Sequence, residues 1–296
     1  MGNRIKPKIK ETQTQTVLGA KLLRSSHRLW IVLILGAVGL VLFSVNSFAA
    51  EKIVSVNACT DELLLQFGKP ERIAGVTNFF HTSPSEALLT KHPEIRRFGG
   101  NAENILIMNP SLVLAESFSN VLLLEQLKKA GIPVLVIAVP RSWEELLAAV
   151  RQISDLAGNP ENSETFRMKI QKLQQASLKS QWYGKRAVFW SAAGHASGRN
   201  TFEDTILSTL GMKNSVNYEG YSFLTLEKLI ELKPDVIVVT QNPDQKDSWA
   251  HTVLFHPVLR AALPGLEYVF IPEVSASCAS AYTVESLSHL LENQTK

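Results

Sequence analysis

The fold is decided by a stretch that occurs twice, as NAENILIMNPSLVL at residues 101–114 and as TLEKLIELKPDVIV at residues 225–238. The two copies align at a constant offset of 124 positions, so that Pro110 corresponds to Pro234. Each copy predicts the same unit. An Asn or Thr caps a short helix, a Glu lies in its first turn, a Pro ends the helix, and an apolar strand follows. The chain is therefore predicted to contain a duplicated α/β unit.

Apolar runs on either side of each copy extend this pattern. Six short runs, most of them rich in β-branched or aromatic residues, predict buried strands, and helical periodicity lies between them. The predicted strands are Lys52–Val56, Leu112–Ala115, Val134–Ala138, Ala187–Trp190, Val236–Thr240 and Tyr268–Ile271. The alternation of strands and helices indicates an α/β fold with a mainly parallel sheet.

The two halves are joined by helix rather than by a Gly/Ser-rich linker. Ser142 caps a predicted helix over residues 143–157, and a second, polar helix is expected over about 161–180. This composition favours a stiff connection. We expect an N-terminal lobe over 52–141, a helical connector over 142–184 and a C-terminal lobe over 185–296. Because ligands of open α/β sheets bind beyond the carboxyl ends of the strands, two such lobes facing each other would enclose a cleft.

Residues 1–49 are predicted to be a signal peptide. An uncharged apolar run over residues 29–43 follows Arg24 and Arg28, and Ser47 and Ala49 supply small residues for cleavage after Ala49. An uncleaved membrane anchor is the alternative, because the uncharged stretch is just long enough to span a bilayer. Both interpretations place the body outside the cytoplasmic membrane, either free in the periplasm or anchored by its N-terminus.

Composition excludes several classes of protein. The chain has 296 residues, of which 45% are hydrophobic and 19% charged, so it is not disordered. Two cysteines exclude a disulfide scaffold, and no Cys-x-x-Cys pair is present. Seven of the 30 basic groups and one of the 27 acidic groups precede residue 50, which leaves the body with a net charge of −3. This charge argues against a nucleic-acid partner.

Two further stretches carry a resemblance to a known family. KIVSVNACTDELLL at residues 52–65 and PERIAGV at 70–76, followed by the first repeat copy, the helical middle and the second copy, resemble in their order the class III periplasmic solute-binding proteins of ABC importers. This is the cobalamin and ferric-siderophore receptor family, and the resemblance covers about residues 52–291. It implies two Rossmann-like lobes joined by a rigid backbone helix, with a shallow cleft between them.

The resemblance also implies a function. The chain would be an extracytoplasmic receptor for a metal chelate, such as a ferric siderophore or haem, or for a corrinoid such as vitamin B12. Its partner would be the permease subunits of an ABC importer. We expect a monomer with no resident cofactor, and the sequence leaves the identity of the ligand open.

Candidate ligand-binding residues lie in the loops after the strands, and these include Asn57 and Arg141. Aromatic groups suit a large, flat, partly apolar ligand. By the resemblance, the aromatic residues at or near the cleft are Phe79, Phe98, Trp190 and Tyr221, although some could be ordinary core. Arginines could hold an anionic chelate by forked hydrogen bonds, with solvated surface as the alternative.

The two cysteines, Cys59 and Cys278, would lie by the resemblance at the cleft-side ends of strand layers in opposite lobes. A disulfide is chemically possible in an oxidising periplasm, provided that the Cα atoms come within about 7 Å. Two thiols facing the cleft, available to a soft metal, and two unrelated buried cysteines are the alternatives.

His81 and His195 could each supply an imidazole to iron or cobalt, but a lone His is more often a surface residue, so no metal site is predicted.

Glu103 and Glu227 occupy the same place in the two repeat copies. Family receptors carry one such Glu on each lobe, so the resemblance implies that both dock on the permease. The alternative is a favourable interaction with the helix dipole alone.

The sequence contains no Gly-x-Ser-x-Gly elbow, no phosphate-binding Gly-rich loop and no His-Glu-x-x-His helix, so none of these motifs indicates an enzyme. A secreted hydrolase using Ser197 or His195, and a membrane-tethered sensor or structural domain, are the alternative functions.

Overall fold

The computed structural model describes residues 52–78, 85–191, 194–241, 254 and 256–293. Met1–Ala49 and Ala50–Lys296 form separate units, and the predicted signal peptide lies outside the described residues. Within the described ranges, no helix combines the length and apolar character needed to cross a membrane.

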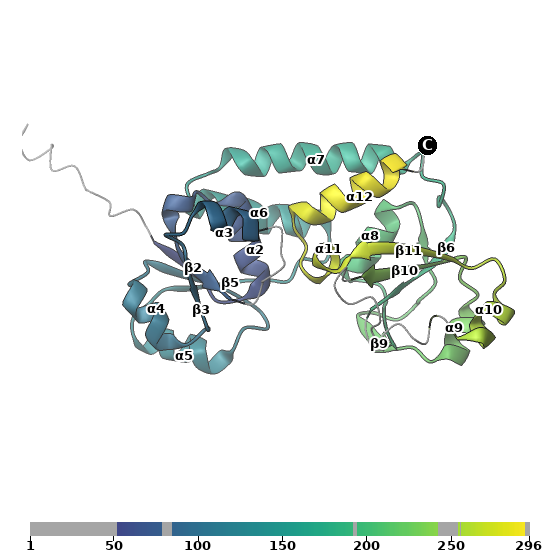
Figure 1. Ribbon diagram of the computed structural model, residues 1–296, viewed down its shortest axis with the longest axis horizontal. Helices are drawn as coiled ribbons and strands as arrows, with labels where there is room; N and C mark the ends of the chain where they lie inside the picture. Colours follow the sequence, from purple (N-terminus) through teal and green to yellow (C-terminus); the bar gives the residue numbers. More distant parts are fainter. Residues whose placement is uncertain (1–51, 79–84, 192–193, 242–253, 255, 294–296) are drawn as a thin grey trace, which may run out of the picture. The chain divides into compact units, whose positions relative to one another are not determined.

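The N-terminal lobe is built on a five-stranded sheet whose strands are all parallel (Figure 1). The strand order is β3-β2-β1-β4-β5. The strands are β1 (Ile53–Ser55), β2 (Ile73–Thr77), β3 (Arg96–Phe98), β4 (Leu112–Glu116) and β5 (Val134–Ile137). The connecting elements are α2 (Ala58–Phe67), the 3₁₀ turn η1 (Pro70–Arg72), α3 (Glu86–Lys91), α4 (Ala102–Met108) and α5 (Val121–Lys129).

The C-terminal lobe has a six-stranded sheet of order β11-β10-β6-β7-β9, with β8 also paired to β6. β6, β8, β10 and β11 pair in parallel, whereas β7 pairs antiparallel with both β6 and β9. The strands are β6 (Arg186–Trp190), β7 (His195–Ser197), β8 (Lys213–Asn214), β9 (Tyr221–Phe223), β10 (Val236–Gln241) and β11 (Glu267–Pro272). The helices are α8 (Phe202–Thr209), α9 (Leu226–Leu232), α10 (Pro257–Ala262), α11 (Glu273–Ser277) and α12 (Ala281–Asn293).

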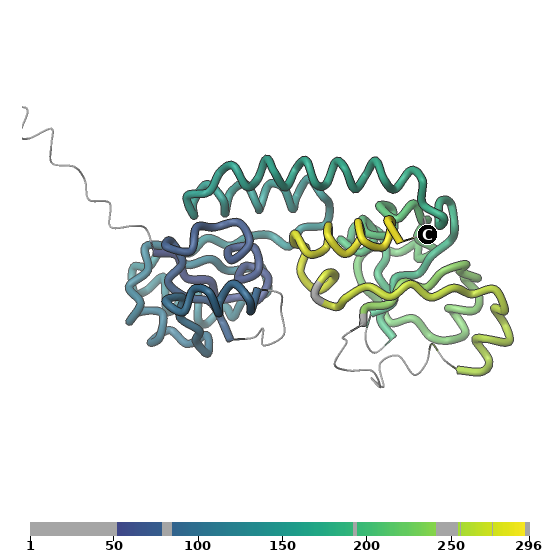
Figure 2. The backbone as a smooth tube through the Cα atoms, turned by 45° about the horizontal axis from the view of Figure 1, so that its top comes forward, coloured from purple at the N-terminus to yellow at the C-terminus, as the bar shows by residue number. Residues whose placement is uncertain are grey.

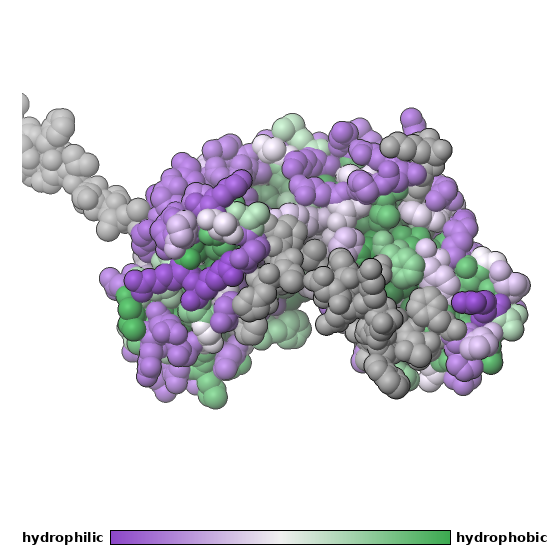
Figure 3. All heavy atoms as spheres, viewed as in Figure 1, coloured by the Kyte–Doolittle hydropathy of each residue, from purple (hydrophilic) through white to green (hydrophobic). Residues whose placement is uncertain are grey.

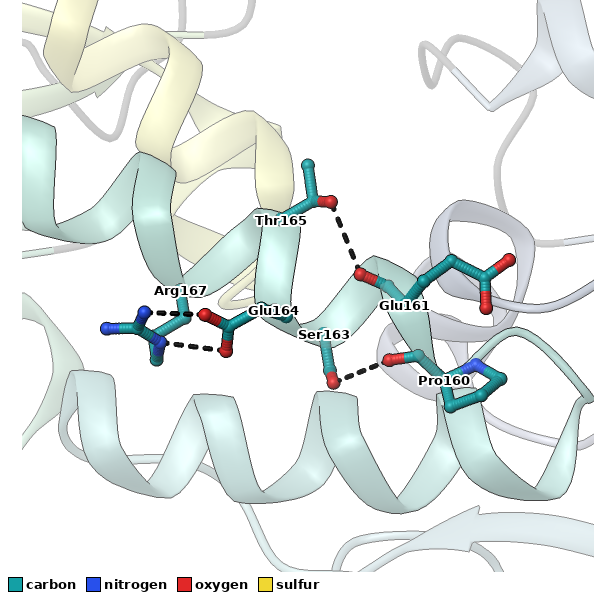
Figure 4. A network of polar contacts seen from close by, with 6 residues as sticks. All are labelled: Pro160, Glu161, Ser163, Glu164, Thr165 and Arg167. Atoms are coloured by element: carbon teal, nitrogen blue, oxygen red, sulfur yellow. Dashed lines mark hydrogen bonds and ion pairs between the residues drawn. The ribbon is translucent and has the colours of Figure 1, made fainter.

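Two consecutive helices connect the sheets, namely α6 (Trp143–Leu156) and α7 (Glu161–Ser177). The final helix α12 packs along α7, as Figures 1 and 2 show. Polar contacts fix the start of α7 (Figure 4): the Ser163 hydroxyl donates to the Pro160 carbonyl at 2.8 Å, and Arg167 Nε donates to Glu164 at 2.9 Å. Figure 3 shows mostly hydrophilic side chains along the outer surface of α7.

Alternate residues of each central strand enter different cores. In β1, Ile53 belongs to a large core shared with the connecting helices, while Val54 belongs to a core with residues of α4 and α5. In β10, Val238 joins the shared core, while Val239 joins a separate core with residues of α9 and α10. Because side chains of a strand alternate between the faces of its sheet, each sheet is covered on both sides.

The repeated unit forms as predicted at its start. Asn101 Oδ1 accepts from the Asn104 backbone N–H at 3.1 Å, and Thr225 Oγ1 accepts from that of Lys228 at 3.3 Å. At its end, however, each helix stops two residues before the proline, at Met108 and at Leu232. Asn109 and Lys233 take the left-handed conformation, with φ of 46° and 48°, and so turn the chain out of the helix.

Candidate functional site

The candidate site is a cavity to which both lobes contribute, at the carboxyl ends of the N-terminal strands. We call it the interlobe cavity. It holds about 490 Å³, counting the part that opens to solvent. From the N-terminal lobe and the connection it is lined by Cys59, Thr60, Leu63, Glu116, Ile137, Ala138, Val139 and Pro140. From the C-terminal lobe it is lined by Phe202, Glu203, Tyr221, Ala276, Ser277, Cys278 and Ala279.

A disulfide between Cys59 and Cys278 forms part of this wall. Cys59 lies in the first turn of α2, and Cys278 directly follows α11. Their Cα atoms are 5.1 Å apart, within the range that a disulfide requires. Of the three arrangements left open by the sequence, the structure has the disulfide, which excludes free thiols as ligands. The bond ties one lobe to the other at the cavity.

Asn57 and Glu116 form the N-terminal side of the site. Asn57 caps α2 by accepting the Cys59 backbone N–H at 2.8 Å, and its amide reaches Glu116 Oε2 at 3.5 Å. Glu116 is the last residue of β4, so the strand itself delivers the carboxyl group to the cavity. Glu116 is only 8% exposed, and its burial raises the pKa of this carboxyl above its usual range.

Tyr221 and Glu203 form the C-terminal side. The Tyr221 hydroxyl on β9 donates to Glu203 Oε2 on α8 at 2.8 Å. Glu203 is 9% exposed, and its burial raises its pKa against the opposing effect of its hydrogen bonds. The pKa of Tyr221 is raised as well, first by burial of its hydroxyl and then by the Glu203 charge. More than half of the Tyr221 surface nevertheless remains exposed, so its ring is available for stacking.

The structure corrects two of the predicted aromatic contacts. Phe98 is buried in the core beside α4 and α5, and Trp190 is wholly buried in the core beside α9 and α10. In both cases the side chain of a strand residue turns into the protein, so it cannot stack on a ligand in this arrangement. Phe79 and His81 lie outside the described residues.

Arg141 and His195 are not among the described residues that line the interlobe cavity. Arg141 is exposed and pairs with Glu145 at 3.6 Å, and it lines an adjoining hollow that shares Ile137, Ala138 and Val139 with the interlobe cavity. His195 is exposed on β7, where its ring meets the edge of Phe223. Among the described residues, no three His, Cys, Asp or Glu side chains come together as a possible metal site.

The two candidate docking carboxylates are both exposed. Glu103 lies in the first turn of α4 and Glu227 in the first turn of α9. In each lobe this helix contributes to the core on the sheet face opposite the shared core. The pKa of Glu227 is lowered, first by a hydrogen bond from its own backbone N–H and then by a hydrogen bond with the Thr225 side chain.

The hydrolase alternative finds no support at Ser197. Its side chain is wholly buried, and its hydroxyl has no hydrogen-bond partner within the part of the chain that the structure describes. A nucleophile must be accessible to its substrate and activated by a base, and Ser197 is neither accessible nor paired with a base there.

Sequence reasoning missed Glu116 and Glu203, which are the acidic groups in the described lining of the cavity. A usable signal existed for Glu116, because it directly follows the predicted strand Leu112–Ala115 and therefore lies at the carboxyl end of a parallel sheet. Glu203 gave no such signal, because an acidic residue two positions after the cap Thr201 has an ordinary explanation in the helix dipole.

The comparison with protein families matches the periplasmic binding protein model over residues 53–248, about two thirds of the chain. The chain belongs to the periplasmic binding protein family. Members of this family are binding proteins of transport, located in the periplasm or its extracytoplasmic equivalent.

Two curated proteins are distant relatives of this chain. The uncharacterized ABC transporter substrate-binding lipoprotein YvrC of Bacillus subtilis is 24% identical over 217 residues, which cover 68% of each chain. A cobalamin-binding protein of Halobacterium salinarum is 23% identical over 212 residues, covering 69% of this chain and 58% of the relative. The chain therefore spans about two thirds or less of the length of these relatives.

Solved structures share the fold. The periplasmic heme binding protein HutB of Vibrio cholerae matches with a TM-score of 0.68 and 22% identity, over 83% of this chain and 100% of that one. The periplasmic vitamin B12 binding protein BtuF of Vibrio cholerae matches with a TM-score of 0.64 and 16% identity, over 83% and 98%. At these identities the likeness establishes the two-lobed α/β architecture.

Proposed function

We propose that this periplasmic binding protein captures a corrinoid or a metal chelate such as haem or a ferric siderophore and delivers it to an ABC importer. The observation that carries the proposal is the interlobe cavity, with residues of both lobes around it and a position at the carboxyl ends of β4 and β5. Cavities at this position of open α/β sheets are the usual ligand sites. The names of the relatives, which include cobalamin and heme binding proteins, support the ligand class.

Tyr221 is the aromatic anchor in this proposal. It is the exposed aromatic residue of the described cavity lining, whereas Phe202 there is buried against Trp143. A planar macrocycle could stack on the Tyr221 ring while its rim meets the polar groups of the cavity. Asn57 supports the site by holding Glu116 and capping the helix that bears Cys59.

Glu103 and Glu227 are proposed to dock the loaded protein on the permease. Each is exposed at the start of the equivalent helix of its lobe, and neither lines the cavity. One carboxylate on each lobe could meet basic groups on two permease subunits, so the duplication of the unit would match a two-subunit partner.

The ligand proposal is tested by titrating the purified protein with cyanocobalamin, haem and ferric hydroxamate siderophores while tryptophan fluorescence is recorded. The absorbance of the protein as purified also reveals any ligand that it carries. Binding at micromolar concentration or below to one member of this panel is expected. Failure to bind any of them, together with steady turnover of another compound such as an ester, would contradict the proposed role.

A further inference from the structure

Among the described residues that line the interlobe cavity, acidic side chains are present and basic side chains are not. Its described lining contains two carboxyl groups, Glu116 from the N-terminal lobe and Glu203 from the C-terminal lobe, and no arginine, lysine or histidine. Each of these glutamates is more than nine-tenths buried, so neither is an ordinary solvated surface acid. The rest of the lining is largely apolar, with the run Ile137–Pro140 and Phe202 among its members.

Neither carboxyl has a basic partner among the described residues. Glu116 Oε2 receives the Asn57 amide, and the Glu203 carboxyl receives the Tyr221 hydroxyl as well as hydrogen bonds from its own backbone N–H and from Thr201. All of these donors are uncharged. The other oxygen of Glu116, Oε1, has no hydrogen bond from a described residue, although it belongs to a side chain that lines the cavity. Ion pairs do form elsewhere in the chain, as between Arg186 and Asp235. The cavity is therefore set apart by having acidic groups that no cation from the described residues neutralises.

Buried carboxyl groups without a cation are costly in the empty protein, and a donor from a ligand would lower that cost. The ligand group that fits is an N–H donor, because carboxyl oxygens accept hydrogen bonds. A ligand that brings its own carboxylates would instead meet like charge, and carboxylate recognition ordinarily uses the fork of an arginine.

We propose that Glu116 and Glu203 act together as an acceptor pair that selects a ligand with N–H donors, chiefly primary amides, on its rim and disfavours one with rim carboxylates. The proposal rests on the receptor function proposed above and narrows its ligand class. It favours the amide-bearing corrinoids over haem, which carries two propionates, and over anionic siderophores.

The test uses two corrinoids that share one ring and one pair of axial cyanides. In one, the rim side chains are primary amides, and in the other they are carboxylates. Titration of the full-length protein should show the amide form binding at least about tenfold more tightly, as expected for one good hydrogen bond or one like-charge contact. Haem and the diamide of haem provide a second pair, with the same expected order.

The double substitution Glu116→Gln with Glu203→Gln should reduce the preference for the amide corrinoid over the carboxylate corrinoid. The change should come mainly from tighter binding of the carboxylate form, because glutamine keeps the size of the side chain and removes its acidity. The two single substitutions provide the same measurement if the double variant does not fold. The matched control is Glu125→Gln, an exposed residue of α5 outside the cavity lining, which should leave the preference unchanged.

The outcomes separate this inference from the receptor role. Equal or tighter binding of the carboxylate form by the wild-type protein would overturn the acceptor pair and leave the receptor role standing. An amide preference that survives in the glutamine variants would also overturn it, because another group would then be responsible. Failure of the wild-type protein to bind any corrinoid, porphyrin or siderophore would contradict the receptor role itself.

Discussion

The two lobes share a scaffold but supply the site by different means. The N-terminal sheet is wholly parallel, and it reaches the cavity through Glu116 at the end of β4 and through the run Ala138–Pro140 directly after β5. In the C-terminal sheet the antiparallel strands β7 and β9 are added beside β6, and β9 carries Tyr221. The duplicated unit therefore explains the scaffold, while the ligand chemistry depends on segments that the two lobes do not share.

A close backbone approach makes the added strands possible. The Gly198 N–H donates to the Gly220 carbonyl at 2.8 Å, and a Cβ atom at Gly198 would collide with the Tyr218 carbonyl oxygen. Because glycine has no Cβ atom, the chain directly after β7 can lie close to the segment that precedes β9. Tyr221 at the start of β9 is thereby held beside Glu203. The N-terminal sheet has no strand pair of this kind among its described residues.

The largest effect is expected for Glu103 and Glu227, which occupy the same place in the duplicated unit of each lobe. Glu103→Arg with Glu227→Arg would place like charges against the basic groups proposed on the permease, at a cost of several kcal/mol. Transport and transporter-stimulated ATP hydrolysis should fall at least about a hundredfold, while ligand affinity stays near that of the wild type. Each single reversal tests whether the lobes contribute equally. Glu161→Arg on the exposed surface of α7 is the control. Transport that survives the double reversal would contradict the docking role.

The next effect concerns the covalent link between the lobes. Removing the disulfide with Cys59→Ser and Cys278→Ser should lower the free energy of unfolding by about 2–5 kcal/mol, because the bond closes a loop with a sequence separation of 219 residues. Urea unfolding with and without dithiothreitol measures the change. The reductant should destabilise the wild-type protein and leave the double variant unaffected. Equal stability of the two proteins under oxidising conditions would mean that the bond does not constrain the unfolded chain.

The scaffold was predictable because its signals are local and occur twice. The caps Asn101 and Thr225, the apolar strand after each proline and the cap Ser142 of α6 all form as predicted. The added strands were not predicted, because β7 and β9 have only three residues each and the run around His195 consists mainly of small residues. Such short segments become strands through tertiary pairing rather than through their own propensity.

The site was less predictable for a different reason. Aromatic residues at strand ends were expected near the cleft, yet the face of the sheet on which a strand residue lies depends on register and packing. Trp190 therefore entered a core, while Tyr221 stayed exposed. The pairing of Cys59 with Cys278 depended on a Cα separation of 5.1 Å, which no sequence pattern contains.

Asp61 marks a difference between the lobes that pH can reveal. In the N-terminal lobe, buried Asp61 of α2 accepts from both the backbone N–H and the hydroxyl of Thr77 at the end of β2. In the C-terminal lobe the corresponding contact runs from the Asn214 amide of β8 to Asp204 of α8, at 2.9 Å. Burial raises the pKa of Asp61 to about 7.

An unfolded aspartate has a pKa of about 3.9, so the folded protein holds this proton at a pH where the unfolded chain has lost it. The stability that Asp61 contributes is therefore fully present below about pH 4 and is lost as pH rises toward 7. The loss amounts to at most about 4 kcal/mol. Asp61→Asn keeps an acceptor for Thr77 and cannot titrate. As pH rises from about 4.5 to 7.5, the wild type should therefore lose unfolding free energy relative to the Asp61→Asn variant. Urea unfolding of both proteins across this pH range measures the difference. A difference that is constant with pH would contradict the assignment.

Tyr221→Ala tests whether the added strands supply the anchor. Loss of the ring should weaken ligand binding by about 1–3 kcal/mol, and Tyr221→Phe, which keeps the ring, should weaken it less. The matched control is Phe223→Ala, an exposed aromatic residue two positions further along β9 that does not line the cavity. Fluorescence titration with the tightest ligand of the panel gives the affinities. Equal losses in the Ala variants at 221 and 223 would remove Tyr221 from the site.

The smallest effect compares the two copies of the repeat directly. Asn101→Ala and Thr225→Ala each remove one cap and should each cost about 0.5–2 kcal/mol of unfolding free energy, whereas Asn101→Ser and Thr225→Ser should cost little. Residues of both lobes belong to one shared core, and the disulfide joins the lobes, so we expect a single unfolding transition that either Ala substitution shifts by a similar amount. Thermal unfolding followed by circular dichroism and by calorimetry measures that transition. Two separate transitions, each moved by only one of the substitutions, would show that the lobes unfold independently and that the duplicated unit is stable without its partner.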